Sequence, residues 1–180
     1  MRVITGTARG RKLDTPENYD IRPTTDVVKE ALFNIIQFDV YGKNVLDLFA
    51  GTGQLGIECL SRGAKTCTFV DKDRKAINIV KKNLAKCELN GDIEYDNAGS
   101  FLERCGKYDL IFIDPPYDTE LYEEVLEKIN KFDILTDGGI IICESRKNRQ
   151  LPAVLPPYIK GKDYSYGKVK ITIYRKLKDI

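Results

Sequence analysis

The feature of this chain that most constrains its fold is a repeated alternation of short apolar runs with longer amphipathic stretches. Each apolar run has the length of one buried strand, and each amphipathic stretch repeats its apolar positions at helical spacing. Alternating strands and helices predict an α/β fold, in which a mostly parallel sheet carries helices on both faces. The expected order is helix 26–36, strand 43–48, helix 54–62, strand 66–71, helix 73–86, strand 93–96, helix 100–104, strand 109–114, helix 120–132 and strand 139–144.

The two ends of the chain differ from this alternating middle. Residues 2–5 and 11–14 alternate around a glycine-containing turn, which predicts a small N-terminal β-hairpin. Two extended segments, 158–164 and 168–175, follow a proline-rich stretch near the other end. Their short connection around Gly167 predicts that they pair as an antiparallel C-terminal hairpin.

The apolar run of residues 109–113 ends abruptly at Asp114-Pro115-Pro116-Tyr117. Neither proline can continue a hydrogen-bonded ladder, because each lacks an N–H and fixes its own φ. The strand must therefore end at Asp114 and present a carboxylate, a stiff turn and an aromatic ring at a sheet edge. A carboxylate and a proline carbonyl can hold an amino group while a ring stacks on its plane. The motif predicts a site for a flat molecule that bears an amino group.

A second motif, the glycine loop at residues 51–56, lies between a short buried strand and the helix that follows it. Its glycines at 51, 53 and 56 match the dinucleotide fingerprint, and Asp71 follows about 20 residues on. An NAD-binding Rossmann protein is therefore one interpretation. Asp47 argues against it, because a carboxylate facing the loop repels a pyrophosphate. It favours a cationic ligand such as S-adenosylmethionine, whose ribose hydroxyls could donate to Asp71.

Polar residues fall at the ends of four separate predicted strands, at Asp47, Asp71, the 96–97 turn and Asp114. In a doubly wound sheet, ligands bind outside the carboxyl ends of the strands at the switch point. Some strand-end aspartates serve only as helix caps, as we expect of Asp73, but capping does not require an acidic residue after every strand. These positions therefore predict a single binding site at one rim of the sheet.

Composition agrees with one compact cytoplasmic enzyme domain. The chain has 180 residues, of which 42% are hydrophobic and 31% charged, and no apolar stretch approaches the length of a membrane helix. Its N-terminus lacks the apolar core of a signal peptide. Five scattered cysteines without a Cys-x-x-Cys pair indicate reduced thiols. Because there is no histidine, His-based catalysis and His-liganded metals are excluded.

Charge is unevenly distributed along the chain. The net charge is +2, but residues 1–12 carry +4 and residues 146–180 carry +8, which leaves −10 for the middle. Basic ends on an acidic body suit a polyanionic partner. Solvated lysines near the termini are the alternative explanation, because charge clusters often lie on a surface without any binding role.

These motifs together resemble the class I S-adenosylmethionine-dependent methyltransferases, and more closely the RsmD family, the bacterial guanine-N2 methyltransferases of small-subunit ribosomal RNA. The resemblance covers nearly the whole chain. The residues that carry it are Arg2-Val3-Ile4-Thr5-Gly6, Arg9-Gly10-Arg11-Lys12-Leu13, Arg22-Pro23-Thr24, Lys29-Glu30-Ala31-Leu32-Phe33-Asn34, Asp47 to Glu58, Ser61-Arg62-Gly63-Ala64, Asp114 to Tyr117, and Tyr166-Gly167. One departure lies after the third strand, where the family has an aspartate near the adenine. Asn97 stands there with Asp96 before it, and the sequence leaves open which of them meets the adenine.

The resemblance implies a Rossmann-like class I methyltransferase core at residues 16–180, preceded by the hairpin extension at 1–15, with S-adenosylmethionine as the cofactor and no metal. It implies 16S ribosomal RNA as the partner, within the 30S subunit or an assembly intermediate, with no obligate protein partner and no membrane. The expected catalytic residues are Asp114, Pro115, Pro116 and Tyr117. The expected cofactor-binding residues are Asp47, Phe49, Ala50, Gly51, Thr52, Gly53, Asp71, Lys72, Asn97, Ala98 and Asp114.

The basic residues near the N-terminus are the expected RNA contacts. Lys and Arg bind phosphates with little regard to sequence, so RNA shape must select the target guanine. The expected contacts are Arg9, Arg11, Lys12, Arg22, Thr24 and Lys29.

The chemistry of the site allows a specific mechanism. Asp114 and the Pro115 carbonyl would accept the two N–H bonds of a guanine amine and direct its lone pair at the sulfonium methyl. Tyr117 would stack on the base, or alternatively pack on the sheet.

Rival functions of other classes leave different signatures. A DNA adenine or cytosine amino-methyltransferase shares the Asp-Pro-Pro-Tyr motif but normally carries a target-recognition insert, which is absent here. A protein glutamine methyltransferase favours Asn at the position of Asp114. A non-catalytic RNA-binding protein has no need of Asp47 and Asp71 at a cofactor rim.

Overall fold

The computed structural model of this protein describes residues 1–16, 26–116, 120–153 and 156–177. The expectations for Arg22, Thr24 and Tyr117 lie outside the described residues. The elements in chain order are α1 (Asp26–Ile35), β1 (Asn44–Asp47), α2 (Gln54–Ser61), β2 (Thr66–Asp71), α3 (Arg74–Cys87), β3 (Asp92–Tyr95), α4 (Ala98–Leu102), β4 (Tyr108–Ile113), α5 (Leu121–Lys131), β5 (Leu135–Arg146), β6 (Tyr158–Tyr166) and β7 (Val169–Lys176).

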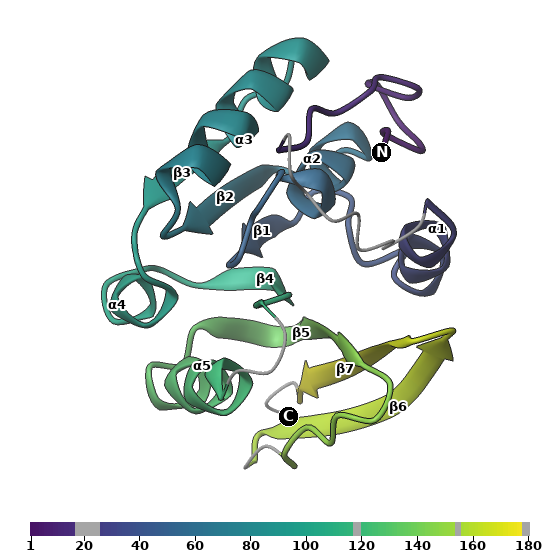
Figure 1. The fold of residues 1–180 in the computed structure, drawn as a ribbon. Helices are drawn as coiled ribbons and strands as arrows, with labels where there is room; N and C mark the ends of the chain where they lie inside the picture. Colours follow the sequence, from purple (N-terminus) through teal and green to yellow (C-terminus); the bar gives the residue numbers. More distant parts are fainter. Residues whose placement is uncertain (17–25, 117–119, 154–155, 178–180) are drawn as a thin grey trace.

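The strands form one seven-stranded sheet in the order β3-β2-β1-β4-β5-β7-β6 (Figure 1). The first five of these pair in parallel, and β7 pairs antiparallel with both β5 and β6. This confirms the predicted α/β fold with its C-terminal antiparallel hairpin. The chain leaves β1 toward β2 and β3 on one side, and returns to β4 on the other side. The switch point of the sheet therefore lies between the ends of β1 and β4.

Each face of the sheet carries its own hydrophobic core. One core packs α1, α2 and α3 on the sheet, and the other packs α4 and α5 on the opposite face (Figure 1). Successive residues of β5 alternate between them: Ile140 and Ile142 belong to the first core, whereas Ile141 and Cys143 belong to the second. Because both faces are covered, the middle residues of β1 and the second half of β4 are apolar and buried.

Two boundaries differ clearly from the sequence prediction. β5 begins at Leu135 and ends at Arg146, longer at both ends than the predicted 139–144. The sequence Asp137-Gly138-Gly139 suggests a turn, but the parallel pairing with β4 continues across it with a shift in register. The helix expected at 100–104 begins instead at Ala98, because the Asn97 side chain accepts a hydrogen bond from the Gly99 N–H and caps it there.

The N-terminal segment folds back on itself but does not form the predicted ladder. Its two arms meet at a single antiparallel bridge between Arg2 and Lys12. Buried side chains of α2 hold the segment in place: the Glu58 carboxylate accepts from the backbone N–H groups of Ile4 and Thr5, at 2.8 and 3.0 Å. The segment is therefore fixed by the polar groups of a helix far along the chain, which local alternation cannot predict.

Candidate functional site

A cavity of about 600 Å³ opens at the carboxyl ends of the parallel strands. Its volume is in the range of sites for small molecules and cofactors. Of the expected cofactor-binding residues, all but Gly53 line it: Asp47, Phe49, Ala50, Gly51, Thr52, Asp71, Lys72, Asn97, Ala98 and Asp114. Pro115 and Pro116 line the same cavity. The two sequence motifs thus meet in one place, as the strand ends predicted.

Asp47 lies at the end of β1 and is only 3% exposed. Its Oδ2 accepts a hydrogen bond from the backbone N–H of Gly56, in the first turn of α2, at 3.0 Å. Burial raises the pKa of Asp47 to about 7; the bond from Gly56 opposes this shift, and the nearby Asp71 adds to it. A carboxylate so poorly solvated gains free energy from any cation that enters the cavity.

Asp71 fixes the geometry of the loops on either side of it. Its Oδ2 accepts from the Gly51 N–H, and its Oδ1 accepts from the Asp73 N–H, both at 2.9 Å. Asp73 in turn caps α3 by accepting from the Lys75 N–H, which confirms the capping role expected of it. A carboxylate has about four acceptor positions, so Asp71 keeps two for hydroxyl donors of a ligand.

The glycine loop is shaped by close packing behind the cavity. Gly53 does not line the cavity; it has φ of +78° and forms the N-cap of α2. Gly56 allows α2 to pack directly on β2, since a Cβ there would lie 2.3 Å from the Phe69 ring. The loop glycines therefore place the start of α2 against the sheet, and Gly51 and Thr52 are the ones that face the cavity.

The turn after β3 brings two acceptors to the cavity, Asp96 and Asn97. Asp96 is held by Arg104, whose guanidinium lies 2.9 Å from its Oδ2, and its Oδ1 accepts from the Asn97 N–H. The Asn97 Oδ1 already caps α4. Both side chains retain an acceptor position, so the geometry keeps both alternatives for an adenine amine.

Asp114 follows β4 directly and is half-buried, Pro115 is buried and Pro116 is exposed. β4 ends at Ile113, which pairs with Cys143 of β5. Burial, with a smaller contribution from the Asp114 charge, raises the pKa of the Cys143 thiol. Asp114 thus stands at the switch point, beside β1 and its Asp47, at the strand end that the proline pair predicted.

Several residues that line the cavity carry no signal in the sequence. Met1 and Pro16 reach it from the N-terminal segment, and the Met1 Sδ lies 3.4 Å from the Thr52 Oγ1. Asn83 of α3 joins these parts from behind: its amide donates to the carbonyls of Asp14 and Thr52. The other lining residues outside the expected cofactor-binding and catalytic sets are Leu48, Gln54, Leu55, Asp73, Lys75, Ala76, Asp96 and Leu121.

The expected RNA-binding residues of the N-terminal segment have different surroundings. Arg9 and Lys12 are exposed. Arg11 donates to Glu88 at 2.9 Å and to the Lys86 carbonyl at 2.5 Å, at the end of α3 that points away from the cavity. Arg9 and Lys12 are therefore accessible to RNA phosphates, as their expected role requires. Arg11 is already paired with the acidic side chain of Glu88.

Lys29 is a correction to the expected RNA-binding set. Its side chain is fully buried, its Nζ donates to the Arg2 carbonyl at 2.5 Å, and it lies 3.8 Å from a Glu58 carboxylate oxygen. Burial lowers the pKa of Lys29, and the charge of Glu58 opposes this shift. A side chain enclosed in this way ties α1 to α2 and to the N-terminal segment, and does not reach a phosphate on the surface.

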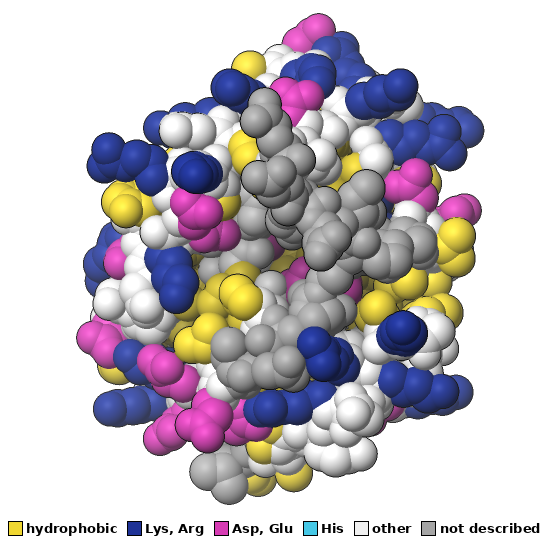
Figure 2. Space-filling view, viewed as in Figure 1, with side chains coloured by type: hydrophobic (Ala, Val, Ile, Leu, Met, Phe, Trp, Pro, Cys, Tyr) yellow, Lys and Arg dark blue, Asp and Glu magenta, His cyan; other side chains and the backbone are white. Residues whose placement is uncertain are grey.

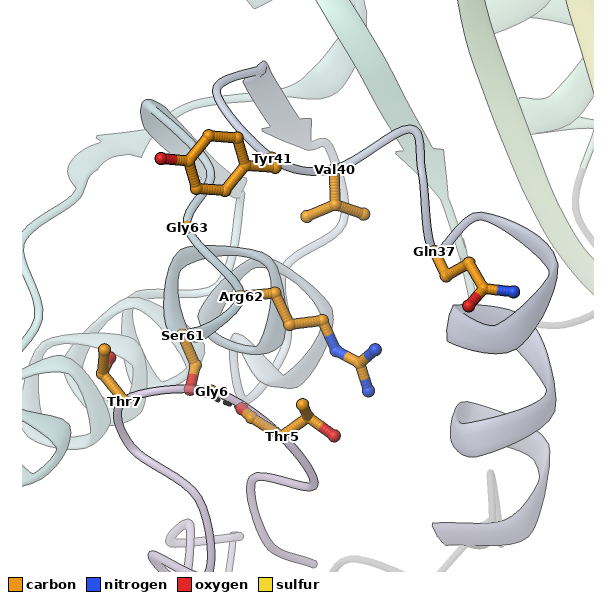
Figure 3. Close-up of a pocket in the computed structure, with 9 residues that line it drawn as sticks. All are labelled: Thr5, Gly6, Thr7, Gln37, Val40, Tyr41, Ser61, Arg62 and Gly63. Carbon is orange, nitrogen blue, oxygen red and sulfur yellow. Dashed lines mark hydrogen bonds between the residues drawn. The ribbon is translucent and has the colours of Figure 1, made fainter.

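A second hollow lies at the opposite end of the molecule, where α1 and α2 end (Figure 3). Arg62 extends into it between the N-terminal segment and α1, and Tyr41 lies over Gly63 (Figure 3). The Arg62 guanidinium is bonded to Glu58 at 2.8 Å and lies 4.6 Å from the centre of the Phe33 ring. Among the described residues that line the hollow there is no carboxylate, unlike the cavity at the strand ends.

The fold and the site define a methyltransferase of the Rossmann-like class. A solved Escherichia coli structure, "Putative methyltransferase yhhF", superposes with a TM-score of 0.89 at 35% identity over 99% of both chains. A family model described as "Conserved hypothetical protein 95" matches residues 1–175.

Relatives that are named as ribosomal RNA methyltransferases match over nearly the whole chain as well. The chain is 36% identical to ribosomal RNA small subunit methyltransferase D of Escherichia coli, over 98% of this chain and 90% of the relative. It is 39% identical to "Putative rRNA methyltransferase YlbH" of Bacillus subtilis, over 98% and 99% of the two chains. The chain therefore belongs to this family, the RsmD family, as the sequence motifs predicted.

Proposed function

We propose that this protein transfers the methyl group of S-adenosylmethionine to the exocyclic N2 amine of a guanine in 16S ribosomal RNA. The observation that carries the proposal is that Asp114-Pro115-Pro116 and the glycine loop line one cavity at the switch point of the sheet. Relatives that align over nearly the whole chain are named ribosomal RNA small subunit methyltransferase D, which supports RNA as the substrate.

The residues of the cavity fit this cofactor. Asp47 supplies a buried carboxylate for a cationic group, and Asp71 keeps acceptor positions for ribose hydroxyls at the next strand end. Asp96 or Asn97 would accept from the adenine amine, and Phe49, Ala98 and Leu121 supply apolar wall. When bound, the cofactor supplies an electrophilic methyl group on a positively charged sulfur.

The residues after β4 would prepare the guanine amine. This amine is a poor nucleophile because its lone pair is delocalised into the ring. The Asp114 carboxylate and the Pro115 carbonyl would each accept one of its N–H bonds, which turns the lone pair toward the methyl group and stabilises the positive charge that develops on nitrogen. A base within a helix must be flipped out to reach Asp114, so we propose an unpaired or extruded guanine as the substrate.

The proposed substrate is a 30S subunit or an assembly intermediate, because a particle offers more contacts than a short RNA. Arg9 and Lys12 remain proposed phosphate contacts on the N-terminal segment. A DNA amino-methyltransferase would use the same cavity, and its substrate separates it from the present proposal.

The proposal is tested by incubating the protein with labelled S-adenosylmethionine and 30S particles from cells that lack it. The expected result is label in N2-methylguanosine after digestion to nucleosides. Label in DNA and none in ribosomal RNA would refute the proposed substrate.

Two substitutions separate the roles of the strand-end carboxylates. Asp114→Ala should keep the affinity for S-adenosylhomocysteine and lower methyl transfer about a hundredfold or more, because one bond at a developing charge is worth about 3–4 kcal/mol. Asp71→Ala should weaken cofactor binding, because it removes the acceptor for the ribose and the anchor of Gly51. The opposite pattern in calorimetry and single-turnover assays contradicts these assignments.

A further inference from the structure

The three C-terminal strands continue beyond the level at which β4 ends. Ile113, the last residue of β4, pairs with Cys143, whereas β5 runs on to Arg146. Arg146 pairs with Val169 of β7, and Val169 pairs with Tyr166 of β6. Three further residues at about 3.4 Å each carry the β6–β7 turn about 10 Å past the end of β4. The turn therefore projects beyond Asp114 on the same side of the sheet.

Two exposed lysines lie at the projecting end of these strands. Lys147 directly follows β5 and Lys168 lies in the β6–β7 turn, and the Lys147 N–H donates to the Lys168 carbonyl at 2.9 Å. We call this pair of lysines the hairpin ledge. Neither lysine takes part in an ion pair within the described parts of the chain. In Figure 2, Lys and Arg side chains gather over the ends of β5, β6 and β7, whereas Asp and Glu side chains gather over α5.

Charged neighbours leave the ledge positive. Arg149 is neutralised by Glu123, to which it donates twice, at 2.6 and 2.8 Å. Lys170 is 4% exposed, donates to the Arg149 carbonyl and lies 3.9 Å from Asp163. The exposed cations at this end of the hairpin are therefore the two lysines of the ledge and Arg146, the last residue of β5.

Arg11, one of the N-terminal basic residues, lies farther from the catalytic end. Arg11 contacts Lys86 and Glu88 at the C-terminal end of α3, while the residues before α3 line the cavity. The 14 residues of α3 span about 21 Å, so the helix separates Arg11 from the strand ends by most of that length. The ledge stands at the same rim of the sheet as Asp114.

We propose that the hairpin ledge binds the phosphates of the RNA strand next to the guanine that enters the cavity. This inference rests on the proposed function, because it names the surface that receives the same RNA. Two ammonium groups on adjoining segments match the repeating negative charge of a single strand, and they hold it without reading its bases. The ledge thus positions the nucleotide, while the cavity selects its base.

The test compares two double variants that change the net charge equally. Lys147→Glu/Lys168→Glu alters the ledge. Lys43→Glu/Lys65→Glu is the matched control, because these two lysines are also exposed and the Lys65 N–H donates to the Lys43 carbonyl. They precede β1 and β2, and so lie at the amino ends of the strands, away from the cavity. Methyl transfer to 30S particles is measured between 50 and 200 mM salt, and affinity for S-adenosylhomocysteine is measured by calorimetry.

The ledge variant should raise KM for the particle about tenfold or more at low salt and leave cofactor affinity within twofold of wild type. The slope of log KM against log salt concentration should be shallower by about 1.4 in this variant. Each lysine contact to a single-stranded phosphate contributes about 0.7 to the slope, and two contacts are lost. A KM and salt slope equal to those of the control overturn the inference, although wild-type transfer to RNA still stands. If the wild-type protein methylates no ribosomal RNA, the proposed function itself fails.

Discussion

The raised pKa of Asp47 predicts a pH dependence of cofactor affinity. Burial raises this pKa to about 7, so the carboxylate is largely protonated at pH 5.5 and largely ionised at pH 7.5. If only the ionised form binds the ammonium group of the ligand, the apparent dissociation constant scales with the inverse of the ionised fraction. The dissociation constant of S-adenosylhomocysteine should then rise about 25-fold between pH 7.5 and pH 5.5.

The raised pKa of Asp47 also affects stability, in the opposite direction: higher pH strengthens cofactor binding but destabilises the folded protein. The folded-state pKa of Asp47 lies above that of an unfolded aspartate, so ionisation disfavours the folded protein. This contribution is absent below about pH 4, and the free energy of unfolding falls as pH rises toward and through 7. Asp47→Asn, which keeps an acceptor for the Gly56 N–H without the charge, should therefore raise the Tm of the ligand-free protein at pH 8.

Asp47→Asn should thus be more stable than wild type and bind the cofactor more weakly, with a flat pH profile. The upper limit of the gain is about 4 kcal/mol, which corresponds to a shift of about three pKa units. Glu88→Gln, a neutralised carboxylate at the far end of α3, is the control and should retain the wild-type pH profile. The reasoning is refuted if the Asp47→Asn protein keeps the 25-fold pH dependence, or if it loses both stability and affinity.

Three further substitutions test the buried contacts behind the cavity. Glu58→Ala removes the buried acceptor that holds α1, α2 and the N-terminal segment, and should lower the free energy of unfolding by about 3–5 kcal/mol in urea titrations. Asn83→Ala leaves the Thr52 carbonyl without its amide donor, and should cost about 2–3 kcal/mol and weaken S-adenosylhomocysteine binding in calorimetry. Gly56→Ala places a Cβ 2.3 Å from the Phe69 ring and should cost about 2–3 kcal/mol, whereas Gly106→Ala, with no atom within 4 Å of its Cβ, should be neutral in the same assay.

The strand ends were the part of the site that the sequence predicted well. Asp114 had to end a strand because two prolines follow it, and glycines at 51 and 53 had to form a loop before a helix. Once strands and helices alternate, topology alone brings such residues to one rim. For this reason the motifs at 47–56 and 114–116, separated by about 60 residues, could be assigned to one cavity from the order of the elements alone.

Contacts between distant segments could not be predicted in the same way. Lys29 was expected to contact RNA, yet it lies on the same helical face as Phe33 and meets Glu58 from another helix. Val27 is apolar and yet 69% exposed, because the buried face of α1 follows Val28 and Lys29 instead. In each case the outcome depends on how α1 is rotated against α2, which helical spacing alone does not fix.

Met1 and Pro16 show the same limit at the cavity itself. Neither residue type suggests cofactor binding, and both reach the cavity only because Glu58 and Asn83 hold the N-terminal segment against α2 and α3. The signal that could have found them is the pair of buried polar residues on those helices, whose partners must come from elsewhere in the chain.

The central claim, that Asp114 and the Pro115 carbonyl hold an amine in line with the methyl donor, is tested most directly by a crystal structure with S-adenosylhomocysteine. The Asp114 carboxylate should be one hydrogen bond from the amine nitrogen, and that nitrogen should be one near-attack contact from the methyl carbon on the sulfur. The Asp114 oxygens should therefore lie within about 8 Å of the sulfur. The Asp47 and Asp71 carboxylates should contact the ammonium group and the ribose hydroxyls, respectively. A sulfur bound well beyond that distance, or directed away from residue 114, contradicts the account.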